Sequence, residues 1–386
     1  MKRILHTIFF ILVAAPVWSQ TLLSDRAIIS LVTYDPSEGA VFTVYGHTAI
    51  RVSDPSNDID LIFNYGIFDF GESDFIYRFT KGETDYKLGV VSFRHLLVEC
   101  EVRGCGAREL VLNLLPQERQ AIWEALLLNA RPENATYRYN FFFDNCATRP
   151  LLLIEKYVLG KIVYAPRGEL HTFRQLINHC MRNNPWMIFG TELVLGSPAD
   201  RTATPREELF LPLYLESAFA GATIVSSVGA ERPLTLRCNT LAVGREPDVS
   251  RALVGPLACA LIMLGLVALI LFWEMYYNVY FRWVDVLLLV VGGLAGCLIF
   301  FLSFVSVHPA TWPNWVILWL HPFHLIGAAL VLVKRWRQGA NLYHILNILC
   351  IAILLLCWPM IPQRFNIAFL PMMLCYGLRS AAALTR

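Results

Sequence analysis

Residues 140–149 read Asn-Phe-Phe-Phe-Asp-Asn-Cys-Ala-Thr-Arg, so an aromatic run ends at a thiol, Cys146, where a helical pattern begins. Asp144 or Asn145 can cap the expected helix, which runs over residues 147–157. The free N–H groups and the dipole of a helix N-terminus favour a thiolate, whereas the nearby Asp144 carboxylate opposes one. Taken alone, the segment fits a nucleophilic cysteine and an inert, buried cysteine equally well.

The chain before this helix has the pattern of strands. Strands are expected where β-branched and aromatic residues gather, at residues 27–33, 41–52, 61–68 and 87–93. A helix is expected over residues 116–129, because Pro116 suits a first turn and apolar residues recur at helical spacing. Residues 171–220 are expected to be mostly helical, and residues 221–249 β-like or rich in loops. Strands first and helices later indicate an α+β domain.

His47 lies on the second expected strand and is a candidate base for Cys146, because imidazole titrates near neutral pH. Asn64, on the next strand, is the first candidate for a group that orients the imidazole, and Asp60 is the alternative. Arg149, about one helical turn after the thiol, is a candidate ligand for a phosphate or carboxylate. Each residue also has a structural interpretation: a sheet histidine, a polar surface residue, or half of a surface ion pair.

Other chemistries have less support in the sequence. The histidines, cysteines and acidic residues show no metal-ligand spacing, and there is neither a Gly-x-Ser-x-Gly elbow nor a phosphate-binding glycine loop. We therefore expect no metal and no cofactor. The net charge is +2 and the basic residues form no run, so nucleic acid is not expected as a partner.

The N-terminus predicts export. Residues 1–20 have a positive start, an apolar stretch and an end of small residues, which is the pattern of a secretory signal peptide. A retained short anchor is the alternative interpretation. We expect three regions: the signal peptide at residues 1–20, a periplasmic domain at residues 21–250 and an all-α transmembrane domain at residues 251–386.

The C-terminal region predicts a transmembrane bundle of about five helices. A fifth apolar segment, residues 367–378, is short and contains Pro371, so it is the weakest of the set. Basic residues favour the loops and the tail that would face the cytoplasm, with Arg379 in the tail. The four longer segments are residues 252–273, 286–307, 315–333 and 345–361.

Three histidines lie in this region. His308 opens a loop on the expected periplasmic side, and His321 and His324 lie inside a span. Polar residues at membrane depth are costly and mark functional sites, although packing between spans is the alternative interpretation. We expect His308 and Tyr45 to join Arg149 as substrate-binding residues.

The ten cysteines divide evenly between the two halves. Disulfides persist outside the cytoplasm, and the number in the exported half is odd, so at least one thiol stays free there. Pairing of Cys100 with Cys105 and of Cys180 with Cys238 would leave Cys146 free, but spacing does not decide the connectivity. Those in the spans are interpreted as apolar fillers: Cys259, Cys297, Cys350, Cys357 and Cys375.

Seven motifs in order resemble the Lnb N-terminal periplasmic domain family. The resemblance covers residues 25–225, and the polytopic C-terminus also fits that family. One departure is Pro150-Leu-Leu-Leu after Arg149, where the family is more polar, which leaves the role of that helical turn open. The motifs are Tyr45–Arg51, Phe63–Phe70, Asp144–Arg149, Asn184–Trp186, Leu195-Gly196, Ala199–Arg201 and Phe210–Pro212.

The resemblance implies a permuted papain-like thiol enzyme, similar to NlpC-type peptidases and lecithin:retinol acyltransferase, in which the histidine precedes the cysteine. Lnb proteins of Bacteroidota are associated with lipoprotein N-acylation in the inner membrane. The implied reaction moves a fatty acyl group from a phospholipid donor, through a thioester on Cys146, to the N-terminal amine of a diacylated lipoprotein acceptor. His47 and Asn64 would complete the catalytic set.

Two other function classes stay open. A membrane-bound thiol hydrolase, either a phospholipase or a cell-wall peptidase, would use the same residues with water or peptide in place of the lipid or the amine. A membrane-tethered binding or assembly protein would not need the thiol at all. The spans favour a lipid substrate over a peptide, because a peptidase does not need a bundle.

Overall fold

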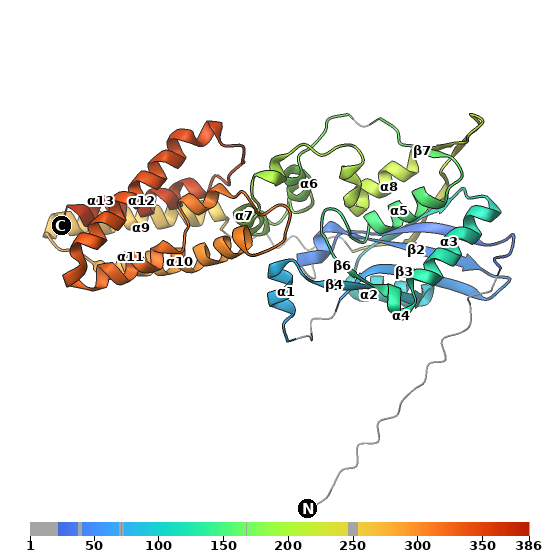
Figure 1. Cartoon of the computed structure of the whole chain (residues 1–386), viewed down its shortest axis with the longest axis horizontal. Coiled ribbons are helices and arrows are strands. Elements are labelled where there is room, and N and C mark those ends of the chain that lie inside the picture. The colour runs from blue at the N-terminus through green and yellow to red at the C-terminus, as the bar shows by residue number, and fades with distance from the viewer. Residues whose placement is uncertain are drawn as a thin grey trace, which may run out of the picture.

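The computed structural model describes residues 22–37, 41–68, 71, 73–166, 168–245 and 254–385. A sheet-rich domain ends at residue 245, and a helical bundle follows from residue 254 (Figure 1). This confirms the expected order of an α+β domain and an all-α bundle. The expected signal peptide and the junction at residue 250 lie outside the described residues, so both boundaries stay predictions.

A seven-stranded sheet forms the N-terminal domain, and each neighbouring pair of strands is antiparallel. The strand order is β10-β5-β1-β2-β3-β4-β6. The inner strand β1 is buried on both faces, which explains why most of its residues are apolar. The bounds are β1 Ile28–Tyr34, β2 His47–Asp54, β3 Ile59–Ile67, β4 Asp85–Ser92, β5 Ala107–Leu112, β6 Thr136–Arg138 and β10 Thr235–Ala242.

The strand expected from residue 41 begins six residues later. Val41–Tyr45 forms a 3-10 turn, η1, and Gly46 then turns the chain into β2. Gly46 has a φ of 72°, and a Cβ there would lie 2.7 Å from the carbonyl oxygen of Tyr34. Glycine meets both demands without strain. The turn leaves His47 at the first position of β2.

Helices cover both faces of the sheet. On one face, α3 (Pro116–Asn129) and α5 (Thr148–Tyr157) pack Trp123 and Ile154 into the main core. On the other face, α2 packs Leu96 against the sheet. The other elements are α1 Phe75–Lys81, α2 Phe93–Arg103, α4 Pro132–Ala135, α6 Phe173–Cys180, α7 Pro185–Val194, η2 Ser197–Asp200, η3 Glu207–Phe210, α8 Pro212–Ala220, β7 Lys161–Val163, β8 Thr223–Val225 and β9 Glu231–Pro233.

Among the described residues 254–385, four segments are long and apolar enough to span a membrane. The fifth helix, α13 (Phe369–Leu384), has 16 residues, a length of about 24 Å at 1.5 Å per residue, which is less than the hydrocarbon thickness. A fifth span therefore stays a prediction. The four segments are Pro256–Tyr277 (α9), Arg282–Phe304 (α10), Trp315–Leu332 (η4 Trp315–Leu318 and α11 Phe323–Leu332) and Arg337–Met360 (α12 Arg337–Cys357 and η6 Trp358–Met360).

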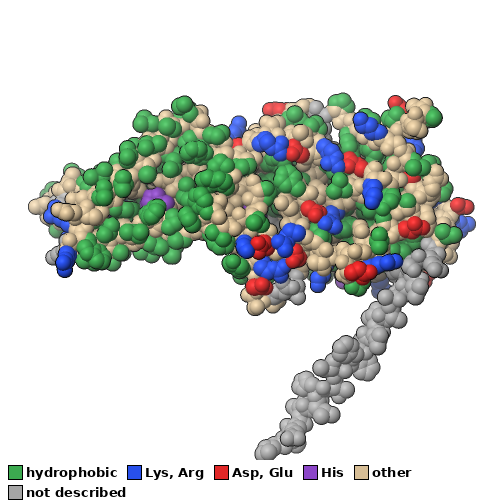
Figure 2. Space-filling view, in the orientation of Figure 1, with side chains coloured by type: hydrophobic (Ala, Val, Ile, Leu, Met, Phe, Trp, Pro, Cys, Tyr) green, Lys and Arg blue, Asp and Glu red, His purple; other side chains and the backbone are tan. Residues whose placement is uncertain are grey.

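The two halves differ in surface chemistry. Figure 2 shows hydrophobic side chains over most of the visible bundle, whereas charged side chains of both signs gather on the N-terminal domain. A few Lys or Arg side chains lie at the end of the bundle away from that domain, which agrees with the positive-inside rule.

Arg379 does not lie in an exposed tail, as the sequence suggested, but is buried within α13. Its Nη1 lies 2.7 Å from Oε2 of Glu274 in α9, and its Nε lies 2.5 Å from Oδ1 of Asp285 in α10. Pairing with two carboxylates offsets the cost of removing the guanidinium from water. This ion triad joins α13 to α9 and α10 and makes it part of the bundle.

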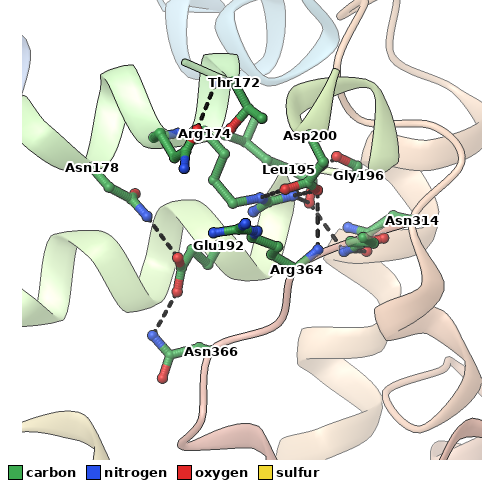
Figure 3. Close-up of polar contacts among 12 residues, drawn as sticks. Thr172, Arg174, Asn178, Glu192, Leu195, Gly196, Asp200, Asn314, Arg364 and Asn366 are labelled. Atoms are coloured by element: carbon green, nitrogen blue, oxygen red, sulfur yellow. Dashed lines mark hydrogen bonds and ion pairs between the residues drawn. The ribbon is translucent and has the colours of Figure 1, made fainter. Parts of the chain in front are cut away.

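Polar contacts join the two halves (Figure 3). Arg174 of α6 pairs with Asp200 at 2.9 Å, and Asp200 also accepts a hydrogen bond from the backbone N–H of Arg364 at 3.2 Å. Glu192 of α7 accepts a hydrogen bond from the Asn366 amide at 2.7 Å. Arg364 and Asn366 both lie between η6 and α13, so that segment holds the periplasmic domain against the bundle.

All ten cysteines lie in the described part of the chain, and all are free thiols. Cys100 and Cys105 are buried and hydrogen-bonded to each other, without a disulfide. Cys180 is half-buried in α6, and Cys238 is exposed on β10. Neither pairing considered from the sequence is formed in this structure.

Candidate active site

The ends of β2 and β3 separate beside the start of α5. Their pairing stops at Ile50 and Phe63, although β2 reaches back to His47 and β3 runs on to Ile67. Gly66, near the end of β3, has a φ of 108°. A Cβ there would lie 3.6 Å from Cε1 of His47 and 3.7 Å from Cβ of Cys146. A histidine and a thiol from distant segments therefore face the same stretch of backbone.

His47 is oriented by Asn64. Nε2 of the imidazole lies 2.5 Å from Oδ1 of the Asn64 amide. An amide oxygen only accepts hydrogen bonds, so Nε2–H is the donor. This contact leaves Nδ1 as the nitrogen that faces Cys146, with which the imidazole also forms a hydrogen bond. The ring of Tyr34, the cross-strand partner of His47, packs edge-on at 5.6 Å between centroids. The imidazole is thus held on three sides.

The two side chains stabilise each other's charged forms. Burial alone would lower the pKa of His47, but the Cys146 thiolate and hydrogen bonds with Cys146 and Asn64 outweigh burial and raise it above 6.5. Burial alone would raise the pKa of Cys146, but the His47 charge and hydrogen bond, together with the Thr48 backbone N–H, lower it below 9.0. The pair therefore favours a thiolate beside an imidazolium.

Asn145, not Asp144, caps α5. Its Oδ1 accepts hydrogen bonds from the N–H groups of Ala147 and Thr148 at 2.8 and 2.9 Å. Its Nδ2 donates to the carbonyl oxygens of Phe141 and Phe210 at 2.7 and 2.9 Å. The buried amide thereby fixes the loop that carries Cys146. It also occupies two of the helix-terminal N–H groups that the sequence suggested as free.

Arg149 has a partner within the protein. It forms a bidentate ion pair with Asp144 at 2.6 and 2.8 Å, and its guanidinium lies 3.6 Å from the centroid of the Tyr137 ring. This arrangement neutralises the carboxylate that opposed a thiolate at Cys146. It matches the surface ion pair that was the alternative interpretation of Arg149, and headgroup binding by Arg149 stays a prediction.

Asp60, the alternative to Asn64, lies elsewhere on the sheet. Its carboxylate forms a bidentate pair with Arg51 at 2.8 and 2.9 Å, and Arg51 also contacts Glu109 at 3.1 Å. Asn64 is thus the candidate that reaches His47.

Tyr45 and His308 have structural contacts. Tyr45 packs against Phe141 at 4.9 Å between ring centroids, and its hydroxyl lies 3.5 Å from Sδ of Met181. His308 donates from Nε2 to the carbonyl oxygen of Phe79 in α1, at 2.9 Å, and so links the bundle to the sheet domain. Substrate binding by either residue stays a prediction.

The intramembrane histidine His324 is used in packing. Its Nδ1 lies 2.6 Å from the Tyr343 hydroxyl, and its Nε2 donates to the carbonyl oxygen of Trp319 at 2.9 Å. Its ring stacks on that of His321 at 4.0 Å. These contacts favour the packing interpretation for this pair.

Two tyrosines near the thiol were not identified from the sequence. The rings of Tyr86 and Tyr139 stack at 4.0 Å between centroids. Burial and then the Cys146 charge raise the pKa of Tyr86 to about 12, and the same two causes raise the pKa of Tyr139 well above 10.0. The aromatic run at residues 137–143 is a sequence signal for Tyr139, whereas Tyr86 lies one residue before an expected strand and carries no such signal. Among the described residues, no group of three or more His, Cys, Asp or Glu could hold a metal ion.

Two family models match the chain. The Lnb N-terminal periplasmic domain matches residues 18–179, and the Lnb transmembrane domain matches residues 248–386. The matches follow the order of the two structural halves. The chain belongs to the Lnb family. A search of curated proteins and a search of solved structures each found no match.

Membership of the Lnb family supports the role of a lipoprotein maturation enzyme. The periplasmic domain and the four helices that can span a membrane make the chain an inner membrane protein with its N-terminal domain in the periplasm. Because no solved structure matches, the papain-like permutation of this Lnb domain stays a prediction.

Proposed function

We propose that this chain is a lipoprotein N-acyltransferase that carries the acyl group on Cys146. The observation behind the proposal is the contact of Cys146 with His47 and of His47 with Asn64, at the end of the sheet that faces the bundle. A thiolate nucleophile, its proton carrier and an orienting amide are what acyl transfer through a thioester requires. The membrane beside the site supplies phospholipid esters.

The first half-reaction forms the thioester. The Cys146 thiolate attacks the ester carbonyl of a phospholipid, and the carbonyl electron pair moves to oxygen. As the tetrahedral intermediate collapses, the C–O bond breaks, and the imidazolium of His47 gives its proton to the departing lysophospholipid oxygen. The products are an acyl-Cys146 thioester, a neutral imidazole and a lysophospholipid.

The second half-reaction forms the amide. The N-terminal amine of a diacylated lipoprotein attacks the thioester carbonyl, and neutral His47 accepts a proton from the attacking nitrogen. Collapse of the intermediate breaks the C–S bond and releases the Cys146 thiolate beside the His47 imidazolium. The enzyme returns to its starting charge state, and no cofactor or oxidant is consumed.

The backbone N–H of Cys146 is the remaining donor for the oxyanion. It and the Thr48 N–H contact the sulfur, whereas the next two N–H groups of the helix are bound to Asn145. One oriented donor at an oxyanion contributes about 10²- to 10³-fold to the rate of acyl transfer. A backbone donor cannot be removed by side-chain substitution, and its position depends on the loop that Asn145 holds.

The test is mass spectrometry of lipoprotein N-termini from cells that carry the wild-type protein, Cys146→Ala or Cys238→Ala as their only copy. We expect N-acylated lipoproteins with wild type and Cys238→Ala, because Cys238 is exposed on an edge strand. Cys146→Ala should leave diacylated lipoproteins. Equal acylation with all three would support a binding protein, and free fatty acid without N-acylation would support a thiol hydrolase.

A further inference from the structure

The short helix α1 exposes an apolar face. Ile76 is 79% exposed, Tyr77 is 56% exposed and Phe79 is 51% exposed. Gly82 ends the helix with a φ of 82°, and a Cβ there would lie 3.2 Å from the backbone nitrogen of His308. Large apolar side chains exposed together on one short helix indicate a contact surface, because they add nothing to the core.

This helix lies against the periplasmic end of α10. The ring of Tyr77 lies 6.1 Å from that of Phe301 between centroids, and the carbonyl oxygen of Lys81 accepts a hydrogen bond from the N–H of Val307 at 2.8 Å. Beside it, the rings of Phe304 and Trp312 pack at 4.6 Å between centroids, tilted by 46°, and both are half exposed. Aromatic residues at the end of a span mark the membrane–water interface. Figure 1 shows α1 between the sheet and the bundle.

An aromatic row leads inward from α1. We define the row as Phe79, Phe75, Phe68, Tyr86 and Tyr139. Successive ring centroids lie 6.0, 5.7, 4.8 and 4.0 Å apart, with interplanar angles of 17 to 32°. The rings come from α1, from the segment after β3, from β4 and from the residue after β6. Because these segments are far apart in the chain, the aromatic row exists only in the folded protein.

The inner end of the row is at the thiol. A Cβ at Gly66 would lie 3.7 Å from Cβ of Cys146 and 4.0 Å from Cδ2 of Tyr86, so the Tyr86 ring and the thiol border the same glycine. The Cys146 charge also contributes to the raised pKa of both Tyr86 and Tyr139. The row therefore connects the membrane surface with the nucleophile.

We propose that α1 inserts its apolar face into the periplasmic leaflet and that the acyl chain of the donor phospholipid passes along the aromatic row to Cys146. The continuity of α1 with the end of α10 argues for lipid as its partner. Phe79, at the outer end, is half exposed, and Phe68 and Tyr139 are partly exposed, whereas Phe75 and Tyr86 are buried, so the chain contacts the row at the three accessible rings. This inference rests on the proposed function and describes how the phospholipid donor reaches Cys146.

The test compares Ile76→Glu with Val228→Glu in the full-length protein in phospholipid vesicles. Val228 is 87% exposed and lies in the turn between β8 and β9, away from the bundle, so it matches Ile76 in exposure but not in location. Formation of acyl-Cys146 is measured with a long-chain phospholipid in the vesicle and with a dissolved short-chain ester. Alkylation by iodoacetamide reports the state of the thiol.

We expect Ile76→Glu to slow acylation from the long-chain donor about tenfold, since a carboxylate resists insertion among acyl chains. Acylation from the short-chain ester and alkylation should stay unchanged, and Val228→Glu should match wild type throughout. Equal rates for Ile76→Glu and wild type with both donors would overturn the inference, as would an equal loss with both donors. If wild type itself formed no acyl-Cys146, the proposed function would fail instead.

Discussion

Nε2 of His47 lies 2.5 Å from Oδ1 of Asn64, and the two residues belong to neighbouring strands whose pairing has already ended. Oδ1 of the amide accepts a hydrogen bond from Nε2–H, so the other ring nitrogen, Nδ1, faces Cys146. A carboxamide in this position orients the ring without adding a charge. The contact therefore affects the rate of acyl transfer by fixing the position of the imidazole.

Asn64→Ala should slow acyl transfer by about 10²-fold, the lower end of what a well-placed general base contributes. The reason is that the imidazole loses its acceptor and rotates, while the thiol stays in place. Asn64→Asp, which keeps an acceptor, should retain more activity than Asn64→Ala. Asp60→Ala is the matched control, because Asp60 pairs with Arg51 and not with His47. Equal losses in Asn64→Ala and Asp60→Ala would show that Asn64 has no special part.

The pH dependence of the thiol follows from the two pKa shifts. The pKa of Cys146 lies below 9.0, so alkylation by iodoacetamide should reach half of its maximal rate at a lower pH than for an ordinary thiol and should fall as the pH is lowered further. In His47→Ala the burial that raises the pKa remains while the opposing charge is gone, so alkylation at pH 7 should drop. An unchanged alkylation profile in His47→Ala would contradict the ion pair.

The rate of acyl transfer should also fall at alkaline pH. The pKa of His47 lies above 6.5, and above that raised pKa the imidazolium loses the proton it must give to the leaving group. The rate of thioester formation should therefore pass through a maximum between the two apparent pKa values, which belong to the pair. Alkylation, which needs only the thiolate, should show no alkaline decline.

Arg149→Ala should affect stability more than binding. The ion pair with Asp144 is partly exposed, and the stacking on Tyr137 adds to it, so the loss in free energy of unfolding should be about 1 kcal/mol. Thermal unfolding in detergent measures this loss, and the KM for the phospholipid donor should stay unchanged. A large rise in KM with no loss of stability would instead support headgroup binding by Arg149.

Removal of the buried cation in the bundle should be costly. Arg379→Met removes the cation between the Glu274 and Asp285 carboxylates, and breaking a buried ion pair in this way costs about 3 to 5 kcal/mol. We expect a lower thermal unfolding temperature and reduced yield from membranes. The triple change Arg379→Met, Glu274→Gln and Asp285→Asn should recover much of the loss, because no charge is left unpaired. If thermal stability did not recover in the triple variant, buried carboxylates without their cation would not explain the loss.

The sequence was informative where local pattern decides the structure. The bounds of α3 match the prediction, because Pro116 and the helical spacing are local signals. The residues chosen around Cys146 include His47, which the structure brings to the thiol, and Asn64, which contacts His47. Their order in the chain and their residue types were enough to select them, although their catalytic roles stay proposals.

Other features depend on contacts that no local pattern contains. Val41–Tyr45 has strand-forming residues, but it forms a 3-10 turn before the close approach of Gly46 to Tyr34. Arg379 reads as a tail charge until α13 packs against α9 and α10. In each case a partner that the sequence does not point to decides the outcome.

The central claim is that Cys146 carries the acyl group, and peptide mass spectrometry of the purified protein after incubation with phospholipid tests it most directly. The account predicts a fatty acyl mass on Cys146 that hydroxylamine removes, that is absent in Cys146→Ser, and that moves to the N-terminal amine of an added diacylated lipopeptide. Formation of N-acylated lipopeptide by Cys146→Ser at the wild-type rate would contradict it.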